Sequence, residues 1–163
     1  MLSRRAQPDD AAAIAAIYNE GIEDRVATFE TRPRSAADIA TWFDGTHPVV
    51  VVENETSILA FASCSAYRTR ACYAGIAEFS VYVARAERGK GIGRLAIQAL
   101  IDEAGAKGFW KLVSRIFPEN QASLRLLQRT GFREVGLYEK HGKLDGVWRD
   151  VVIMELLLRE NLR

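Results

Sequence analysis

The stretch that decides the fold runs Val81-Tyr-Val-Ala-Arg-Ala-Glu-Arg-Gly-Lys-Gly-Ile-Gly-Arg94, where a β-rich run enters a glycine-rich turn and an apolar helix. Three glycines leave backbone N–H groups uncovered at the start of this helix, where the helix dipole also favours an anion: Gly89, Gly91 and Gly93. Four basic side chains flank those amides: Arg85, Arg88, Lys90 and Arg94. The stretch therefore predicts a site for two or more phosphates, with a solvated basic turn as the plainer alternative.

This turn differs from the other glycine-rich nucleotide motifs. A Walker A loop needs Gly-x-x-x-x-Gly-Lys followed by Ser or Thr, and the chain contains no such run. A Gly-x-Gly-x-x-Gly motif that begins at Gly89 fails because Arg94 takes the place of the third glycine.

Composition and charge are those of an ordinary globular protein. Of 163 residues, 48% are hydrophobic and 26% are charged, and no linker or repeat divides them, so we expect a single domain over residues 1–163. Twenty-two basic and 21 acidic residues leave a net charge of +1, which removes the broad positive field of a nucleic-acid binder. We therefore expect neither nucleic acid nor a membrane as a partner.

Cysteine and histidine usage predicts that the protein holds no metal. Cys64 and Cys72 have no Cys-x-x-Cys spacing, and the chain has only two histidines. Asp9 and Asp10 stand where a signal peptide needs an apolar core, and no window approaches the ~20 apolar residues of a membrane span. These features predict a reduced, cytoplasmic protein.

Hydrophobic periodicity and turn residues predict an alternation of helices and strands. The expected helices cover residues 9–21, with Asp9 as the cap, 35–45, with a Ser35/Asp38 capping box, 91–107 and 120–130. The expected strands cover residues 49–53, 58–67, 73–83, 112–117, 134–140 and 147–157. In the 91–107 helix, Leu95, Leu100 and Ile101 are expected to face inward. This order predicts an α/β (α+β) fold, a mixed sheet with helices on both faces.

Two motifs resemble those of the GCN5-related N-acetyltransferase (GNAT) superfamily. Arg88-Gly-Lys-Gly-Ile-Gly93 matches the family's acyl-CoA loop, Arg/Gln-x-x-Gly-x-Gly/Ala. Asn120-Gln-Ala-Ser123, with Gly131-Phe132 downstream, matches its Asn-x-x-Ala/Ser helix and Gly-Phe end, although these residues are also ordinary helix caps. The resemblance covers the chain from Ser3 to Leu157 and implies the GNAT fold, a mixed and mostly antiparallel splayed sheet.

The resemblance also implies acetyl-CoA as the co-substrate, lying in an opening between two strands. The backbone of Val81, Tyr82 and Val83 would pair with the pantetheine arm as another strand would. The pyrophosphate would bind the loop formed by Arg88, Gly89, Lys90, Gly91, Ile92, Gly93 and Arg94. Asn120 and Ser123 complete the expected cofactor-binding set.

Residues spread over the chain resemble more closely the phosphinothricin, arsinothricin and methionine sulfoximine N-acetyltransferases. They are Tyr18-Asn19, Thr28-Phe29-Glu30-Thr31, Arg70, Tyr73, Glu78, Gly142-Lys143, Gly146, Trp148 and Asp150. The resemblance implies acetylation of the α-amine of a glutamate-like amino-acid analogue, a homodimer, and a role in detoxification or resistance. Phe29, Thr31, Arg68, Arg70 and Tyr73 would contact the substrate, since forked guanidinium donors suit its anionic groups.

Glu78 is the expected catalytic base. Along its strand it alternates with Phe79, Val81 and Val83, so it faces a cleft while those residues face the core. An acceptor amine arrives as an ammonium and must lose a proton before it attacks a thioester. A salt-bridged structural glutamate is the alternative.

Two departures from the family pattern leave roles open. Leu127 stands where many members have a tyrosine that protonates the departing thiolate, so the acid is Tyr73, Tyr138 or water. Asp145 stands where some relatives have a histidine or an aromatic residue, and it has three candidate partners: a substrate ammonium, Lys143 or a second subunit's arginine.

The sequence is also compatible with other functions. The alternatives are acetylation of a protein N-terminus or a polyamine, and a non-catalytic acyl-CoA-binding regulatory module. A peptide acceptor favours an open groove, whereas a small anion favours a closed pocket.

Overall fold

The computed structural model describes residues 1–163 and is built on one seven-stranded sheet, in the spatial order β1-β2-β3-β4-β5-β7-β6. The strands are β1 (Leu2–Arg5), β2 (Val49–Glu53), β3 (Ile58–Ala66), β4 (Ile76–Val83), β5 (Lys111–Ile116), β6 (Arg133–Leu144) and β7 (Val147–Leu157). Neighbouring strands are antiparallel except for β4 and β5, which are parallel. The expected mixed, mostly antiparallel sheet is confirmed.

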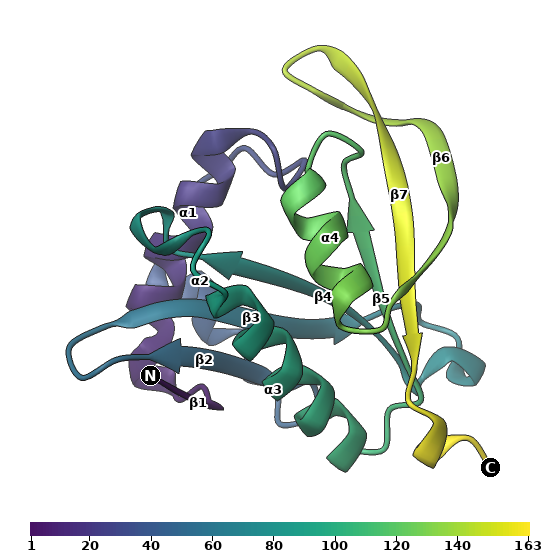
Figure 1. The fold of residues 1–163 in the computed structure, drawn as a ribbon, viewed down its shortest axis with the longest axis horizontal. Helices are drawn as coiled ribbons and strands as arrows, with labels where there is room; N and C mark the ends of the chain where they lie inside the picture. Colours follow the sequence, from purple (N-terminus) through teal and green to yellow (C-terminus); the bar gives the residue numbers. More distant parts are fainter.

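Helices cover both faces of the sheet (Figure 1). They are α1 (Ala11–Asp24), α2 (Ala36–Ala40), α3 (Ile92–Ala106) and α4 (Gln121–Arg129). On one face, Ile14 of α1 and Ile39 of α2 pack in a buried cluster with Phe61. On the other face, Ile97 of α3 and Leu127 of α4 belong to a larger buried cluster. Burial of these two clusters is the main force that holds the helices on the sheet.

The parallel pair β4 and β5 separates part-way along its length. β5 pairs with β4 only over Ile76–Glu78, whereas β3 pairs with β4 as far as Val83. Beyond Glu78, the buried Ser114 hydroxyl of β5 still donates to the Phe79 carbonyl at 3.2 Å. The far half of β4 therefore has a neighbour on one side only, and an opening lies on the other side.

Alternation along β4 divides its side chains between the two faces as expected. Ala77 and Phe79 belong to the cluster under α3 and α4, and Tyr82 belongs to the cluster under α1 and α2. Glu78 lines a cavity together with Ser80 and Tyr82, on the α1 side of the sheet.

Several expected boundaries were wrong. β1 was not expected, because its Leu-Ser-Arg-Arg sequence at the sheet edge has no apolar alternation. Asp10, not Asp9, is the residue that precedes α1, and its carboxylate accepts a hydrogen bond from the Gln7 amide at 2.7 Å.

The expectation for the buried face of α3 was wrong at one position. Leu100 is buried and Ile101 partly buried, but Leu95 is 42% exposed. Ile92 and Ala96 take the inward positions instead, because they share the helical periodicity with Leu100. The strand expected from residue 73 begins at 76, since residues 71–73 form a short 3-10 turn.

β6 and β7 form a long hairpin that extends beyond α4 in Figure 1. Its turn, Asp145-Gly146, has φ of 51° and 78°, and such positive values favour Asp-Gly in two-residue hairpin turns. Most side chains of β6 are exposed at the sheet edge.

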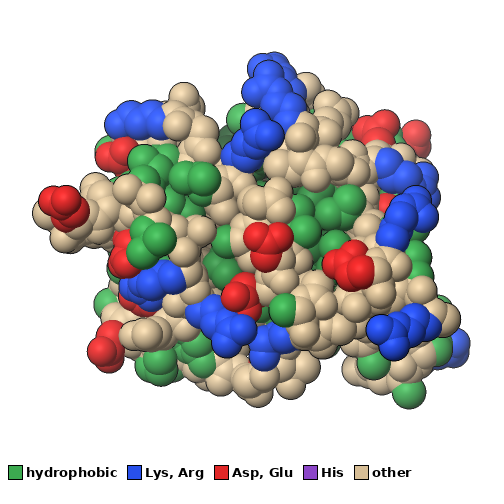
Figure 2. All heavy atoms as spheres, turned by 60° about the horizontal axis from the view of Figure 1, so that its bottom comes forward, with side chains coloured by type: hydrophobic (Ala, Val, Ile, Leu, Met, Phe, Trp, Pro, Cys, Tyr) green, Lys and Arg blue, Asp and Glu red, His purple; other side chains and the backbone are tan.

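On the face in Figure 2, basic and acidic side chains are interspersed, with apolar side chains between them. None of the helices is both long and apolar enough to cross a membrane.

Candidate active site

The glycine loop, residues 88–94, joins β4 to α3 and leaves the start of that helix open. Gly89 and Gly91 have φ of 78° and 80°, which residues with side chains rarely adopt. Gly91 is the N-cap of α3 and no side chain caps the helix, so its first amides keep their capacity to donate. A Cβ at Gly91 would meet nothing within 4 Å, so an anion has room to approach. Gly93 serves packing, since a Cβ there would lie 3.0 Å from Leu126.

Most of the basic side chains around the glycine loop are already paired. Asp24 of α1 binds both Arg88, at 2.5 Å, and Arg85, at 2.9 Å, and their hydrogen bonds hold the pKa of this carboxyl below its ordinary value. Lys90 pairs with a glutamate three residues earlier at 3.0 Å. Arg94 has no acidic partner. Arg85 and Arg88 thus fasten the loop to α1. Phosphate binding by these basic side chains stays a prediction.

β4 presents a free backbone edge to the opening. The Ala84 amide donates to the Leu59 carbonyl of β3 at 2.8 Å. Because amides alternate in direction along a strand, those of Val81 and Val83 point away from β3. An extended ligand can pair with this edge as another strand would.

A narrow cavity of about 30 Å³ lies in the opening between β4 and β5. Its lining brings together Val81 and Tyr82 of β4 with Asn120 and Ser123 at the start of α4. The Asn120 side chain caps α4 by accepting a hydrogen bond from the Ser123 amide at 3.3 Å. Leu127, one turn further along α4, also lines this cavity. Residues of two distant motifs thus meet at one place.

Glu78 lies where two larger cavities meet, of about 330 and 510 Å³. Tyr18, Ser65 and Ser80 line both cavities with it. The Arg115 Nη2 lies 3.0 Å from the Glu78 Oε1, yet this buried oxygen accepts no hydrogen bond. The contact is electrostatic, and the carboxylate keeps its hydrogen-bonding capacity for a ligand.

Aromatic side chains form part of the wall of the larger cavity. Phe29 packs edge-on against Phe117 at 4.8 Å and approaches Gly142 so closely that a Cβ there would lie 2.8 Å from its ring. Tyr18 and Tyr82 lie 5.1 Å apart, and burial raises the pKa of both phenols. These phenols therefore stay protonated at neutral pH.

Four of the predicted substrate residues lie outside this lining. Arg68 stacks on the Tyr67 ring at 4.4 Å, and Arg70 precedes the short 3-10 turn that contains Tyr73. Neither arginine lines a cavity that contains Glu78, and neither does Thr31 or Tyr73. Their contact with substrate stays a prediction. Of the predicted set, the structure brings only Phe29 beside Glu78.

Two unpredicted residues, Arg115 and His141, line the larger cavity. Strand alternation puts Arg115 on the same face of β5 as Val113, and the parallel pairing of Val113 with Glu78 brings that face beside Glu78, so alternation was only a partial signal. His141 reaches the cavity from β6 through the strand order alone, and its local sequence gives no such signal.

Asp145 pairs within the chain with a residue that was not considered from the sequence. Its carboxylate lies 3.2 Å from the Nε of Arg25, at the end of α1 in the same chain. Lys143 instead lies over the Trp148 ring at 4.8 Å. The ion pair joins the tip of the β6–β7 hairpin to α1.

The sequence model of the Acetyltransferase (GNAT) family matches residues 14–132. The chain belongs to the GNAT acetyltransferase family. This GNAT enzyme is 34% identical over 160 residues to the L-methionine sulfoximine/L-methionine sulfone acetyltransferase of Pseudomonas aeruginosa, over 95% of this chain and 93% of that protein.

Two solved structures show the same GNAT architecture. One is a GNAT superfamily phosphinothricin acetyltransferase from Sinorhizobium meliloti in complex with AcCoA, with a TM-score of 0.88 and 32% identity over 96% of this chain and 87% of that one. The other is a ribosomal-protein-alanine N-acetyltransferase from Brucella melitensis, with a TM-score of 0.91 and 32% identity over 96% and 99% of the two chains.

The geometry of this GNAT enzyme fits acetyl-CoA as the co-substrate. The open start of α3 suits a pyrophosphate, and the free edge of β4 suits an extended amide-bearing arm. Both features lead toward Glu78, the last β4 residue that pairs with β5. Reaction at the end of such an arm would take place beside this carboxylate.

Proposed function

We propose that this GNAT enzyme acetylates the α-amine of a small amino-acid analogue of the phosphinothricin, arsinothricin or methionine sulfoximine type. The observation that carries the proposal is the position of Glu78, between the opening that fits acetyl-CoA and a cavity lined in part by aromatic side chains. The volume of that cavity, about 510 Å³, suits a small molecule. The names of the Pseudomonas and Sinorhizobium relatives support the same substrate class.

Glu78 provides the base in the proposed reaction. Bound acetyl-CoA supplies an activated acetyl thioester. Glu78 takes a proton from the acceptor ammonium, directly or through water. The amine nitrogen then bonds to the acetyl carbon, the carbon–sulfur bond breaks, and CoA leaves as a thiolate. The nitrogen gives up its second proton to water or to the departing sulfur, which leaves a neutral amide. The amides of Val81 and Val83 face the opening, where one of them can stabilise the charge that develops on the thioester oxygen.

Acetylation would change how other proteins recognise the acceptor. An ammonium becomes a neutral amide, so an enzyme that binds the free amino acid through that charge loses an ion pair. We propose detoxification or resistance as the biological role, in the cytoplasm.

A panel of acceptors tests this function. Acetyl-CoA, a thiol reagent and the pure protein are mixed with phosphinothricin, arsinothricin, L-methionine sulfoximine, spermidine and short peptides. We expect turnover of at least one glutamate analogue and poor turnover of spermidine. Efficient acetylation of spermidine, with no turnover of the three analogues, would overturn the substrate class and leave acetyl transfer intact.

Acetylation of a protein N-terminus is the second candidate, because the Brucella structure carries the name of such an enzyme. Phe29 and Phe117 close one side of the Glu78 cavity, which is unfavourable for a peptide chain. Peptides that begin with alanine therefore belong in the same panel, and a preference for them over free amino acids would support this second function.

We also propose a homodimer that forms through β6. This strand is the edge of the sheet, and Val135, Leu137 and Tyr138 on it are each about half exposed. An edge strand with unpaired backbone groups can pair with the same strand of a second copy.

A further inference from the structure

We propose that Arg115 selects acceptors that carry a free α-carboxylate, which its guanidinium binds while Glu78 receives the neighbouring ammonium. The proposal rests on the function proposed above and names the residue that recognises an α-amino acid as such. It assigns to Arg115 a role in substrate specificity.

The position of Arg115 is the first argument. Its side chain lines both the narrow cavity in the β4–β5 opening and the larger cavity that contains Glu78. It therefore lies between the place that fits the acetyl donor and the place that fits the acceptor. No other Lys or Arg lines either of the two cavities that contain Glu78.

The unused hydrogen bonds of Arg115 are the second argument. A guanidinium has five N–H donors, and Arg115 donates none of them to a protein acceptor. Its one polar contact is the electrostatic approach to Glu78 at 3.0 Å. By contrast, Arg88 and Arg133 are both hydrogen-bonded to carboxylates. A carboxylate could accept two parallel hydrogen bonds from the free fork of Arg115.

The two charges of an α-amino acid are complementary to those of Glu78 and Arg115. Its ammonium and carboxylate are attached to one carbon, so they lie about as close together as the two protein groups. When such a zwitterion binds, the ammonium faces Glu78 and the carboxylate faces Arg115, and every charge keeps a partner. Four other titratable groups line this cavity: the protonated phenols of Tyr18 and Tyr82, His141, and Glu30, which is already paired with Arg34 at 2.8 Å.

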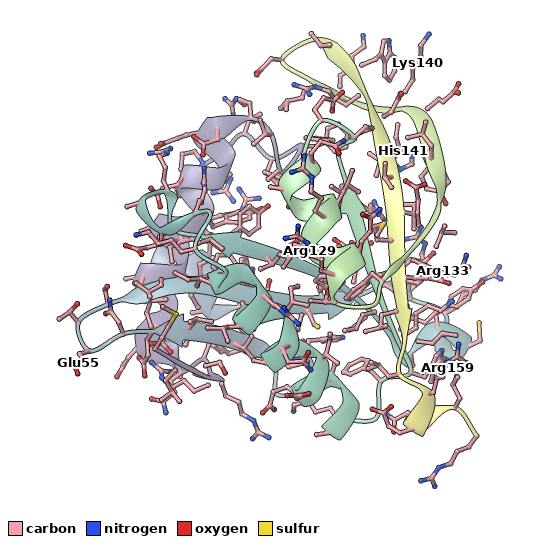
Figure 3. The ribbon with its side chains drawn as sticks, in the orientation of Figure 1. Glu55, Arg129, Arg133, Lys140, His141 and Arg159 are labelled. Atoms are coloured by element: carbon pink, nitrogen blue, oxygen red, sulfur yellow. The ribbon has the colours of Figure 1, made fainter.

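The test compares two acceptors that differ only in the carboxylate: L-methionine sulfone and its α-carboxamide. The values of kcat/KM are measured at saturating acetyl-CoA for the wild type, Arg115→Gln and Arg115→Lys. Arg133→Gln is the matched control, since Arg133 pairs with Glu155 at 2.7 Å and lies at the start of β6, outside the cavities (Figure 3). Circular dichroism verifies that each variant is folded.

We expect Arg115→Gln to lower kcat/KM for the amino acid by about 10- to 100-fold, between the small effect of an exposed charged pair and the larger effect of a buried one, since the Arg115 side chain is 38% exposed. The carboxamide should change little, and the KM for acetyl-CoA should stay close to that of the wild type. Arg115→Lys should recover part of the loss, because a point charge cannot reproduce a forked contact. Arg133→Gln should leave both acceptors unaffected.

Equal losses for the two acceptors, no loss for either, or a raised KM for acetyl-CoA would each overturn the role of Arg115. A wild type that acetylates the amino acid and the carboxamide equally well would overturn it too, while the proposed function stands. A wild type that accepts peptides or polyamines but no α-amino acid would overturn both.

Discussion

The orientation of the Glu78 side chain is set by its neighbours along the strand. Ala77 and Phe79 are almost completely buried and hold the strand in the core, which directs the residue between them toward the opposite face. Its side chain is 29% exposed, so ligand and water can reach a carboxylate that remains partly shielded. Such a group suits proton transfer at the junction of two cavities.

Glu78→Gln keeps the shape of this side chain and removes its capacity as a base. We expect kcat near pH 7 to fall by roughly 10²–10⁴, with little change in acetyl-CoA binding. The loss should shrink at high pH, because more of the acceptor amine is already unprotonated. Glu134→Gln, on exposed β6, is the control. Near-normal turnover of Glu78→Gln at pH 7 would return Glu78 to a structural role.

Gly91→Val tests the glycine loop at its most open position. A side chain at φ of 80° strains the backbone and also enters the space before the first amides of α3, so we expect a strong rise in the KM for acetyl-CoA. Gly108, with φ of 90° and equally free space, lies just beyond the other end of the same helix. Gly108→Val should cost stability but leave the KM unchanged. If both variants bind acetyl-CoA equally well, the loop is wrongly assigned.

At the scale of elements, the site exists because β4 and β5 begin together and then separate. The common start is held at Gly75, whose carbonyl accepts a hydrogen bond from the Trp110 amide at 2.9 Å. A Cβ at Gly75 would lie 2.0 Å from the Trp110 ring, so only glycine allows this approach. From this start the two strands pair as far as Glu78 and then separate.

Gly75→Ala should therefore destabilise the protein, by about 1–3 kcal/mol in the free energy of unfolding, because the Trp110 ring must move. Urea denaturation measures the change. Gly136→Ala, in β6, is the matched strand control, since a Cβ there meets nothing within 4 Å. A Gly75→Ala protein as stable as the control would show that the ring shifts at no cost.

At the scale of the whole molecule, carboxylates with lowered pKa join distant parts of the chain. Hydrogen bonds from Arg4 lower the pKa of both Asp10 and Glu53, and so join β1 to α1 and β2. Asp44 acts locally: burial raises its pKa, but hydrogen bonds from the neighbouring His47 and Thr46 outweigh burial and lower the value to about 2. These groups stabilise the fold when they are ionised.

The pH dependence of stability follows from the sign of these shifts. Because each folded pKa lies below its unfolded value, the stabilisation is complete above about pH 5 and is lost as the pH falls toward 2. Urea denaturation at pH 7, 5, 4 and 3 should show a progressive fall in the free energy of unfolding. Asp44→Asn should make this fall shallower. A free energy of unfolding that stays constant from pH 5 to pH 3 would contradict the claim that these ionised carboxylates stabilise the fold.

The proposed dimer is tested by the mass of the protein in solution. Light scattering after size-exclusion chromatography should give twice the chain mass for the wild type. Leu137→Glu places a charge on the edge strand of each copy and removes an exposed apolar side chain, so it should give monomers, since Leu137 is about half exposed and lies on the sheet edge. A monomeric wild type would contradict the dimer.

The sequence alone predicted those features that depend on residues close together in the chain. The period of two in β4 placed Glu78 opposite Phe79, and the glycines of residues 88–94 predicted an open helix start. Ser35 and Asp38 predicted their capping box because its hydrogen bonds span only three residues. In each case the physical cause acts within one or two turns of chain.

Long-range pairing was beyond the reach of those patterns. Arg85 and Arg88 bind Asp24 across more than 60 residues, and Asp145 meets Arg25 only because the fold brings the tip of the β6–β7 hairpin to the end of α1. Arg115 becomes a partner of Glu78 through the parallel pairing of two strands separated by α3. The position of a charged side chain in the sequence does not indicate which opposite charge it will contact. That partner is determined by the strand order and by the packing of the helices on the sheet.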